Sequence, residues 1–521
     1  MEIVLEMQDI CKTFYGDGVE VKANDHINFT LAKGEIHALL GENGAGKSTL
    51  VASLFHKPDQ GTIKIHGKIV DLKNPMMAMK YGIGIARQDL SNSLVERHTV
   101  AENILSISKG FFLSLNSVAD KIKSVLKKLD LGELNPNMKV GRLSGGEKQR
   151  VEILKALITD PNIIILDEPT AMLTPEEIRN LFRLLKQLSS QGKSIVLISH
   201  HLDEAVNFSD RITILRQGKL IEVINTHKLK ETWQSEDEGI RYLANLMVGH
   251  EISYNLNKEI HESGKTALAI KNVSINNDLG DQIVKNISLD INEGQILGLA
   301  GISGNGQTEL IESIIGWRKT EQGQILIREE DVTNTNINNI RKQGVAYIPE
   351  DRRKALVTDL SVRENLMLNL YQESQNIFID SNSIVKKTNL LIERFKIKTP
   401  NPLVPVRTLS GGNKQKIVLA RELSLTPPEN KKIIIIAENP TFGLDIATTL
   451  FVREELLKMR AQGAAIFLVS NDLTEILTLS DKIAVIYKGE IVGIVESMNA
   501  NRENIGLLMG GRKQKKEAEN E

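Results

Sequence analysis

Cysteine is nearly absent from this sequence. Cys11 is the single cysteine among 521 residues. One thiol excludes an intramolecular disulfide framework, and it also excludes zinc and iron–sulfur sites that need several cysteines. The composition therefore permits a reducing compartment.

Long apolar runs are absent as well. Apolar runs such as residues 163–166 and 433–437 fall far short of the roughly 20 residues that a membrane-spanning helix needs. The first ten residues, MEIVLEMQDI, carry acidic side chains early and lack both a basic region and a small-residue cleavage site. We therefore expect neither a transmembrane segment nor a secretory signal.

The chain also lacks an excess of charge of one sign. Lys and Arg number 65 against 66 Asp and Glu, which gives a net charge of -1 at pH 7. Without a broad basic field, we expect no nucleic-acid partner. The shares of hydrophobic residues (41%) and charged residues (25%) are typical of soluble globular proteins, and the length predicts two or three domains.

The sequence does contain an internal duplication. LSGGEKQR at residues 143–150 returns as LSGGNKQK at 409–416, and GENGAGKS at 41–48 is echoed by GISGNGQT at 301–308. The copies lie about 260 residues apart, which is the size of a domain and too long for a solenoid repeat. Two homologous halves are therefore expected.

Each half predicts an α/β domain with a mainly parallel sheet. Short β-branched runs such as IVLIS and KIAVIY alternate with amphipathic stretches such as EEIRNLFRLLKQL, whose apolar residues recur at helical spacing. We predict domains at residues 1–250 and 266–505, a polar linker at 251–265 and a charged flexible tail at 506–521.

The first half contains a complete phosphate-binding loop between an apolar strand and a helix. Its glycines let successive backbone N–H groups curl around phosphate oxygens at a helix N-terminus, where the helix dipole also favours an anion. Lys47 would reach the β- and γ-phosphates, and the Ser48 hydroxyl would bind Mg²⁺. The predicted ATP-binding residues of this loop are Gly41, Glu42, Asn43, Gly44, Ala45, Gly46, Lys47, Ser48 and Thr49.

Polar residues that follow apolar strands supply the remaining chemistry. IIILDEPT ends in Asp167, which suits Mg²⁺, and Glu168, which suits polarising the attacking water. Alone, such a pair is usually a solvated turn, but the phosphate loop favours catalysis. His200, in ISHH, is expected to contact the γ-phosphate, with a structural hydrogen bond as the alternative, and Gln88 is a candidate metal or water ligand. The predicted catalytic residues are Lys47, Gln88, Glu168 and His200, and the predicted metal ligands are Ser48, Gln88 and Asp167.

With phosphate loop, LSGG string, carboxylate strand and strand-terminal polar residue in the same order twice, the chain resembles the ATP-binding-cassette (ABC) ATPases over nearly its whole length. The resemblance implies two tandem nucleotide-binding domains of the P-loop NTPase fold, each with a helical subdomain. It also implies that two cassettes close head to tail, so that Ser410, Gly411 and Gly412 complete the first ATP site. Phe14, in ICKTF, would stack on the adenine ring.

The second copy departs from the family pattern. Lys47, Ser48, Asp167, Glu168, His200 and Gln88 become Gln307, Thr308, Glu438, Asn439, Asn471 and Glu350. Gln307 removes a full positive charge and Asn439 cannot act as a base, so we expect weakened nucleotide binding and poor hydrolysis. The degenerate second site comprises Gly301, Gly304, Gly306, Gln307, Thr308, Glu438, Asn439 and Asn471 with Ser144, Gly145 and Gly146 of the first half. The loop that crosses to the partner site in the family keeps Asp445 in half two but has Thr174 in half one.

The strings MVGH and GVAYIPEDR look like the ATPase subunits of bacterial importers for monosaccharides and nucleosides. That resemblance implies ATP and Mg²⁺ as cofactors, separate integral-membrane permease subunits, an extracytoplasmic solute-binding protein, and a peripheral position on the cytoplasmic face of the inner membrane. The segments after Gln88 and Glu350 are the expected permease-docking surfaces. IAENPTFGLD and TAMLTPEE resemble the nucleoside branch, so the predicted solute is a purine nucleoside, with ribose or galactose as the alternative.

Three other classes fit less well. Ribosome-acting tandem cassettes typically have a long charged linker and two competent sites, and neither is present. DNA-repair relatives need zinc-binding cysteines, which one cysteine cannot supply. A non-catalytic scaffold would not need the complete set of Lys47, Asp167, Glu168 and His200.

Overall fold

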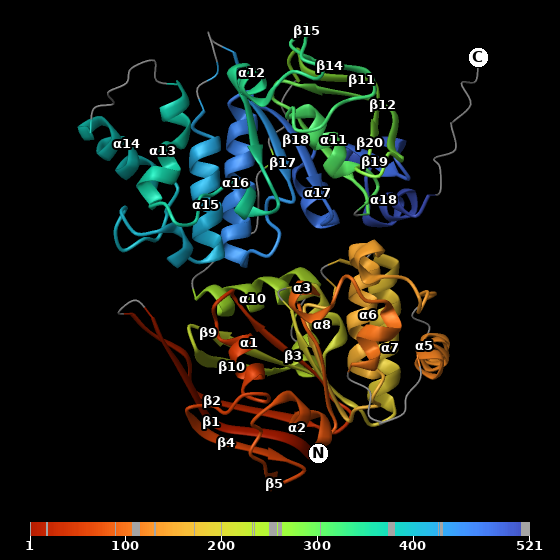
Figure 1. Cartoon of the computed structure of the whole chain (residues 1–521). Coiled ribbons are helices and arrows are strands. Elements are labelled where there is room, and N and C mark those ends of the chain that lie inside the picture. The colour runs from red at the N-terminus through yellow and green to blue at the C-terminus, as the bar shows by residue number, and fades with distance from the viewer. Residues whose placement is uncertain are drawn as a thin grey trace. The chain divides into compact units, whose positions relative to one another are not determined.

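The computed structural model of the chain forms two compact units, Met1–Tyr254 and Asn255–Glu521, and each is described by itself (Figure 1). It describes every residue except 1, 17–18, 89, 107–114, 130–131, 171, 174, 200, 232, 234, 250–257, 259–262, 303, 374–380, 426, 428–430 and 512–521. None of the helices in the described part is long and apolar enough to cross a membrane.

The first unit combines two sheets. The larger has the order β10-β9-β3-β8-β7-β6, parallel except for β10, and the smaller antiparallel sheet has the order β2-β1-β4-β5. Their strands are β1 (Ile3–Gly16), β2 (Val19–Ala32), β3 (Ile36–Gly41), β4 (Gln60–Ile65), β5 (Lys68–Ile69), β6 (Ile83–Ala86), β7 (Ile163–Asp167), β8 (Ser194–Ile198), β9 (Arg211–Arg216) and β10 (Lys219–Asn225). The helices are α1 (Lys47–Ala52), α2 (Pro75–Lys80), α3 (Leu90–Ser93), α4 (Val100–Leu105), α5 (Leu115–Leu129), η1 (Val140–Arg142), α6 (Gly145–Leu157), α7 (Pro175–Ser190), α8 (Leu202–Phe208), α9 (Thr226–Lys230) and α10 (Glu236–Val248).

The second unit repeats this topology. Its larger sheet has the order β16-β17-β18-β13-β19-β20, and its antiparallel sheet has the order β12-β11-β14-β15. The strands are β11 (Thr266–Asn276), β12 (Gln282–Asn292), β13 (Ile296–Ala300), β14 (Gln322–Ile327), β15 (Glu330–Asp331), β16 (Val345–Ile348), β17 (Ile434–Glu438), β18 (Ala465–Ser470), β19 (Lys482–Tyr487) and β20 (Glu490–Glu496). The helices are α11 (Gln307–Ile314), α12 (Ile337–Lys342), η2 (Arg352–Lys354), α13 (Val362–Glu373), α14 (Ser381–Arg394), η3 (Val406–Thr408), α15 (Gly411–Glu422), α16 (Ile446–Ala461), α17 (Leu473–Leu479), η4 (Ser497–Asn499) and α18 (Arg502–Met509).

Each parallel sheet is covered on both faces, which explains its unbroken apolar strands. In β7, Ile163 and Ile165 join the core shared with the antiparallel sheet, whereas Ile164 and Leu166 join the core beneath the helices. Alternate side chains of a strand point to opposite faces, so burial on both sides requires a continuous apolar run. The helices α13, α14 and α15 gather at the opposite end of the second unit from its antiparallel sheet (Figure 1).

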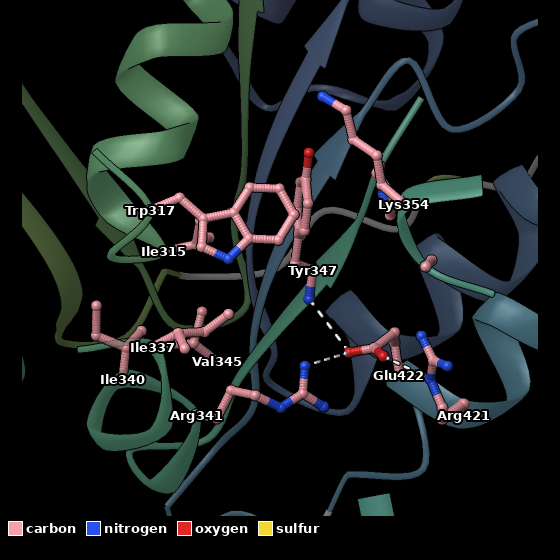
Figure 2. Close-up of a pocket in the computed structure, with 12 residues that line it drawn as sticks. Ile315, Trp317, Ile337, Ile340, Arg341, Val345, Tyr347, Lys354, Arg421 and Glu422 are labelled. Atoms are coloured by element: carbon pink, nitrogen blue, oxygen red, sulfur yellow. Dashed lines mark hydrogen bonds and ion pairs between the residues drawn. The ribbon is translucent and has the colours of Figure 1, made fainter. Parts of the chain in front are cut away.

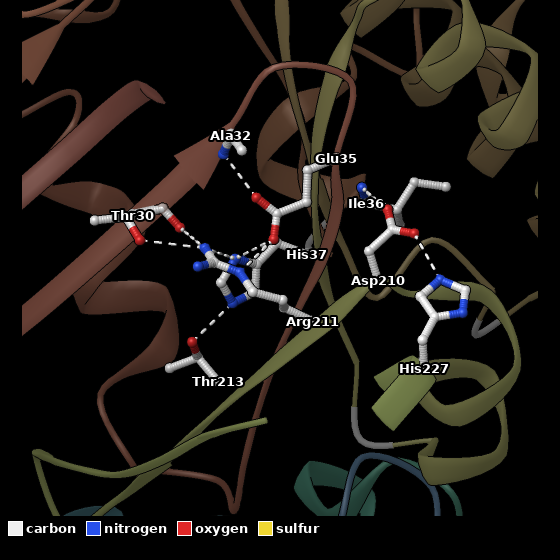
Figure 3. Close-up of polar contacts among 9 residues, drawn as sticks. All are labelled: Thr30, Ala32, Glu35, Ile36, His37, Asp210, Arg211, Thr213 and His227. Carbon is white, nitrogen blue, oxygen red and sulfur yellow. Dashed lines mark hydrogen bonds and ion pairs between the residues drawn. The ribbon is translucent and has the colours of Figure 1, made fainter. Parts of the chain in front are cut away.

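A buried polar cluster fixes the start of β3 beside β9 (Figure 3). Glu35 accepts hydrogen bonds of 2.6 Å from Arg211 Nε and from the Ala32 N–H, and His37 Nε2 lies 2.8 Å from Thr213 Oγ1. Burial lowers the pKa of His37, although the neighbouring Glu35 acts in the opposite sense. The imidazole is therefore neutral at pH 7.

The end of the second unit differs from the expectation. The helix α18 runs past the boundary predicted at residue 505, because Ile505, Leu508 and Met509 are buried in the core of this unit. Residues 506–509 therefore belong to the fold and not to a tail. Within the predicted linker, Lys258 is described: its ammonium bonds to the Ser480 carbonyl and lies 3.4 Å from Asp481 Oδ1.

Candidate nucleotide-binding sites

The phosphate loop of the first unit joins the buried strand β3 to the helix α1. Gly46, the N-cap of α1, has a φ of 101°, and a Cβ there would lie 2.2 Å from the Ala23 carbonyl oxygen. The buried Asn24 side chain donates to the Gly46 carbonyl at 3.0 Å. Only glycine fits this conformation beside β2, so the β1–β2 hairpin fixes the shape of the loop.

Lys47 is folded into its own loop. Its side chain is buried, and its Nζ donates to the carbonyl oxygens of Gly41 at 2.6 Å and Glu42 at 3.1 Å. The positive charge is therefore held inside the turn of the loop, where phosphate oxygens would bind.

Asp167, at the end of β7, lies beside Ser48. The pKa of Asp167 is raised to about 6, chiefly by burial and also by the adjacent Glu168, while Lys47 and a hydrogen bond from Ser48 oppose the shift. Hydroxyl and carboxylate oxygens in a site with unbalanced negative charge suit Mg²⁺, which keeps several ligands from phosphate and water. Among the described residues, no group of three or more His, Cys, Asp or Glu side chains could hold a metal. The Ser48 hydroxyl and the Asp167 carboxylate are two oxygen ligands, and they fit a Mg²⁺ whose remaining ligands come from nucleotide and water.

Glu168 and Gln88 form a pair between neighbouring strands. Gln88 follows β6, and its Nε2 donates to Glu168 Oε2 at 2.5 Å. Glu168 is buried, its φ is 49°, and its N–H donates to the Ile198 carbonyl at 2.9 Å. The carboxylate is thus held in one orientation next to Asp167, as the predicted base requires.

Phe14 lies on β1, opposite Val21 of β2, and is 52% exposed. Lys12 Nζ lies 5.9 Å from the centre of the Phe14 ring and is paired with Asp59 at 2.6 Å. An exposed aromatic face on the hairpin that holds Gly46 suits stacking on a base.

Ser144 and Ser410, the serines of the two LSGG strings, each cap a helix. Ser144 Oγ accepts from the Glu147 N–H at 3.3 Å at the start of α6, and Ser410 Oγ accepts from the Asn413 N–H at 3.4 Å at the start of α15. The glycines that follow are Gly145 and Gly146 in α6 and Gly411 and Gly412 in α15.

Gly412, in the second LSGG string, packs closely against the start of α16. A Cβ on Gly412 would lie 2.7 Å from Thr448 Oγ1 and 3.2 Å from Asp445 Oδ2. Asp445 caps α16 by accepting from the Thr448 N–H at 2.8 Å. The two helix N-termini are therefore fixed to each other.

The second phosphate loop, 301–308, holds an amide where the first holds an ammonium. Gln307 Nε2 donates to the Ile302 carbonyl at 3.0 Å, and Gln307 Oε1 accepts from the Asn305 N–H at 3.1 Å. Gly304 and Gly306 keep positive φ angles of 90° and 103°. The turn is preserved, but one of its N–H groups is bonded to a side chain.

Glu438, the counterpart of Asp167, is bonded through both oxygens. Its Oε1 accepts from Thr308 Oγ1 at 3.0 Å, and its Oε2 accepts from the Tyr347 hydroxyl at 2.5 Å. Burial and the neighbouring Glu438 raise the pKa of Tyr347 well above its usual range, so the phenol remains a donor.

Asn439, the counterpart of Glu168, is bonded on both sides. Its Nδ2 donates to Glu350 Oε2 at 2.6 Å, and its Oδ1 accepts from the Asn471 N–H at 2.8 Å. Burial raises the pKa of Glu350, while the hydrogen bond from Asn439 acts against this shift. In the second unit the carboxylate therefore follows β16 and the amide follows β17, the reverse of the arrangement at β6 and β7.

Comparison with known proteins decides the family. The sequence matches the ABC transporter family over residues 24–171 and 284–440. The chain belongs to this family. We call Met1–Tyr254 the first cassette and Asn255–Glu521 the second cassette. The predicted family and the predicted fold, two tandem cassettes of the P-loop NTPase type, are thereby confirmed.

Relatives match over nearly the whole chain. The nucleoside import ATP-binding protein NupA of Lactococcus lactis subsp. cremoris is 40% identical, covering 98% of each chain. The guanosine import ATP-binding protein NupO of Bacillus subtilis is 39% identical, covering 99% of each chain. The ribose import ATP-binding protein RbsA of Shouchella clausii is 34% identical, covering 96% of this chain and 97% of the relative.

The structure brings most predicted residues of the first cassette together. Lys47, Ser48, Asp167, Glu168 and Gln88 surround one phosphate loop. The predicted residues His200 and Thr174 lie outside the described residues.

Two features of the second site were not predicted from the sequence: the Tyr347 hydroxyl and the replacement of Phe14. Tyr347 occupies the position of Ile85 in the first cassette, and a phenol within an apolar strand was the available signal. Counting from the corresponding residues Leu5 and Leu268, the position of Phe14 is taken by Asn277, which follows the end of β11. The second cassette therefore has no aromatic side chain at that position.

Proposed function

We propose that this chain is the ATP-hydrolysing subunit of an importer, that its first phosphate loop hydrolyses ATP with Mg²⁺, and that its second does not. The complete set around the first loop carries this proposal: a buried lysine inside the loop, a hydroxyl beside a carboxylate, and a second carboxylate oriented by Gln88. The names of the full-length relatives, which are import ATP-binding proteins, support it.

In the first cassette, different residues are proposed to bind phosphate, to hold the metal and to activate the attacking water. Lys47 would leave the Gly41 and Glu42 carbonyls to pair with phosphate oxygens, which concentrates positive charge where the transferred phosphoryl group carries negative charge. Ser48 and Asp167 would hold Mg²⁺, which neutralises phosphate charge. Glu168 would accept a hydrogen bond from the attacking water and orient it, while Gln88 fixes the carboxylate. His200 is proposed to contact the γ-phosphate.

The ATP site is proposed to be completed by the other cassette. Ser410, Gly411 and Gly412 would face the first loop, and Ser144, Gly145 and Gly146 would face the second. The helix N-termini at Ser144 and Ser410 support this proposal, because backbone N–H groups and the helix dipole at such ends favour phosphate.

Separate permease subunits are proposed to dock beside Glu350. A groove in the second cassette is lined by apolar side chains that include Ile337, Ile340 and Val345 and by the basic side chains of Arg341 and Lys354 (Figure 2). Trp317, 45% exposed, and Tyr347 form its aromatic wall. A mixed apolar and charged groove suits an amphipathic helix of a membrane partner. Such docking would place the chain on the cytoplasmic face of the inner membrane, with an extracytoplasmic solute-binding protein delivering the solute.

The proposed solute is a purine nucleoside. The relatives named for nucleoside and guanosine import are 40% and 39% identical, against 34% for the ribose import protein. The strings IAENPTFGLD and TAMLTPEE point the same way. Import of ribose or galactose is the second candidate.

Uptake measurements test both levels of the proposal. Cells carrying wild-type or Lys47→Ala protein are given labelled guanosine and, separately, labelled ribose and galactose. Loss of guanosine uptake alone would support the nucleoside assignment. Loss of sugar uptake alone would contradict it, and unchanged uptake of all three would contradict the importer function.

A further inference from the structure

We propose that Tyr347 closes the second phosphate loop to Mg²⁺–nucleotide by occupying the carboxylate that would bind the metal. Tyr347 would then determine whether the second site accepts a metal, and this site would lack a bound metal as well as a general base. The inference rests on the proposed ATPase function, because it concerns the metal of the same type of site.

The residues around the second loop do not fit Mg²⁺ as they stand. Thr308 and Glu438 have the kinds of oxygen atom that would bind a metal in the first cassette, a hydroxyl and a carboxylate. Each oxygen of Glu438, however, accepts a hydrogen bond: Oε1 from the Thr308 hydroxyl at 3.0 Å and Oε2 from the Tyr347 hydroxyl at 2.5 Å. Mg²⁺ demands nearly ideal octahedral geometry at short distances. A cation at Glu438 would have to compete with the Thr308 and Tyr347 hydroxyls for the carboxylate oxygens, and the Tyr347 hydroxyl is the competitor that the first cassette lacks.

The hydrogen bond from the Tyr347 hydroxyl to Glu438 is strong, so breaking it is costly. It joins a neutral phenol to a carboxylate, and Glu438 is only 6% exposed. Hydrogen bonds to a charged acceptor are roughly twice as strong as neutral ones, and the low dielectric of a buried site strengthens them further. In the first cassette Ile85 occupies the position of Tyr347 and has no hydroxyl to donate to Asp167.

The ring of Tyr347 is also held in place (Figure 2). Trp317 packs edge to face against it, with ring centres 5.6 Å apart and planes at 85°. The Tyr347 N–H lies 3.4 Å from Glu422 Oε2, and Glu422 is itself bonded to Arg341 at 3.1 Å and Arg421 at 2.9 Å. The hydroxyl is therefore presented to Glu438 by a ring with little freedom to turn away.

The test measures metal binding to the second cassette of the full chain. Mn²⁺ replaces Mg²⁺ as the spectroscopic probe, and a non-hydrolysable ATP analogue is present. The substitution Lys47→Ala weakens nucleotide binding at the first phosphate loop. In this background, Tyr347→Phe keeps the ring against Trp317 and removes the hydroxyl. We expect the Mn²⁺ affinity of the second site to rise about tenfold, which is the effect of one hydrogen bond to a charged group.

A matched control and a second variant sharpen the test. Tyr242→Phe removes another Tyr–Glu hydrogen bond, from Tyr242 to Glu222 at 3.2 Å, and should leave Mn²⁺ affinity unchanged. Glu438→Asp shortens the carboxylate to that of the first cassette, pulls it from the Tyr347 hydroxyl, and should raise Mn²⁺ affinity too.

Two results would overturn the inference: strong Mn²⁺ binding at the second site of the Lys47→Ala chain itself, or unchanged affinity in both Tyr347→Phe and Glu438→Asp. ATP turnover by chains with Lys47 intact is measured separately. Its absence would count against the proposed function, whereas the metal affinities decide the role of Tyr347.

Discussion

Gln88 and Glu168 are joined by a hydrogen bond of 2.5 Å from amide to carboxylate, and the second cassette contains the same kind of contact with the two groups exchanged. There the amide belongs to Asn439 and the carboxylate to Glu350, at 2.6 Å. One amide and one carboxylate are present in each pair, so the exchange keeps the charge and the hydrogen bond. In the second cassette the carboxylate of Glu350 follows β16. The position of Glu168, after β17, is taken by Asn439, which cannot act as a base for water.

The exchange predicts unequal effects of mutation at the two strand ends. Glu168→Gln should lower steady-state ATP turnover at least about 100-fold, because it removes the general base and leaves a side chain of the same size. Asn439→Ala should retain most of the turnover. Comparable losses in the two proteins, measured by phosphate release under identical conditions, would contradict a single hydrolytic site.

Two glycines of the first loop should respond differently to alanine. Gly44→Ala carries only the backbone cost of a φ of 84°, about 1–2 kcal/mol, because a Cβ there meets no described atom within 4 Å. Gly46→Ala carries a similar backbone cost and a clash with Ala23 and Asn24. We expect Gly46→Ala to lose nucleotide binding and Gly44→Ala to weaken it less, as measured by titration with a fluorescent ATP analogue. Equal affinities would show that the β1–β2 hairpin does not fix the loop.

The buried His37 should make the first cassette sensitive to acid. Its pKa is lowered in the folded state, so its contribution to stability is complete above the unfolded value of about 6.5 and is lost as the pH falls below it. Between pH 7.5 and 5.5 the free energy of unfolding should therefore fall, because the unfolded chain takes up a proton at His37 more readily than the folded chain does.

A matched variant separates this effect from other titrations. The positions of His37 and Thr213 are taken by Leu297 and Ala484 in the second cassette, so the double variant His37→Leu, Thr213→Ala copies a pairing that the fold already accepts. Denaturant unfolding of this variant should show a smaller loss between pH 7.5 and 5.5 than the wild type. An unchanged pH dependence would assign the acid sensitivity to other groups.

Asp445 offers a test in which stability and activity separate. It caps α16, and the proposed head-to-tail closure of the two cassettes would bring it to the first ATP site. Asp445→Ala should lower the free energy of unfolding by about 1 kcal/mol through the lost cap, whereas Asp445→Asn should retain most of the cap. Turnover should fall in both variants if the carboxylate acts at the ATP site, and wild-type turnover in Asp445→Asn would limit Asp445 to capping.

The sequence predicted those features that depend on local spacing. Glycines at fixed intervals between a strand and a helix predicted the phosphate loops, and apolar runs that end in polar residues predicted Asp167, Glu168 and Gln88. Several contacts between distant segments were not predicted. Tyr347 and Glu438 meet because β16 and β17 are neighbours in the sheet, and Asn24 reaches Gly46 because β2 passes beside the loop. Single-sequence patterns contain no information about such pairings.

The strand orders have a consequence for synthesis on the ribosome. Among the described residues, every strand of the two sheets in the first cassette precedes the start of the second cassette, and the sheets of the two units share no strand. Domains generally fold as units, with the N-terminal one first. The half that carries the complete phosphate loop can therefore fold while the other half is still being translated, and a nascent chain could acquire nucleotide affinity before the polypeptide is finished.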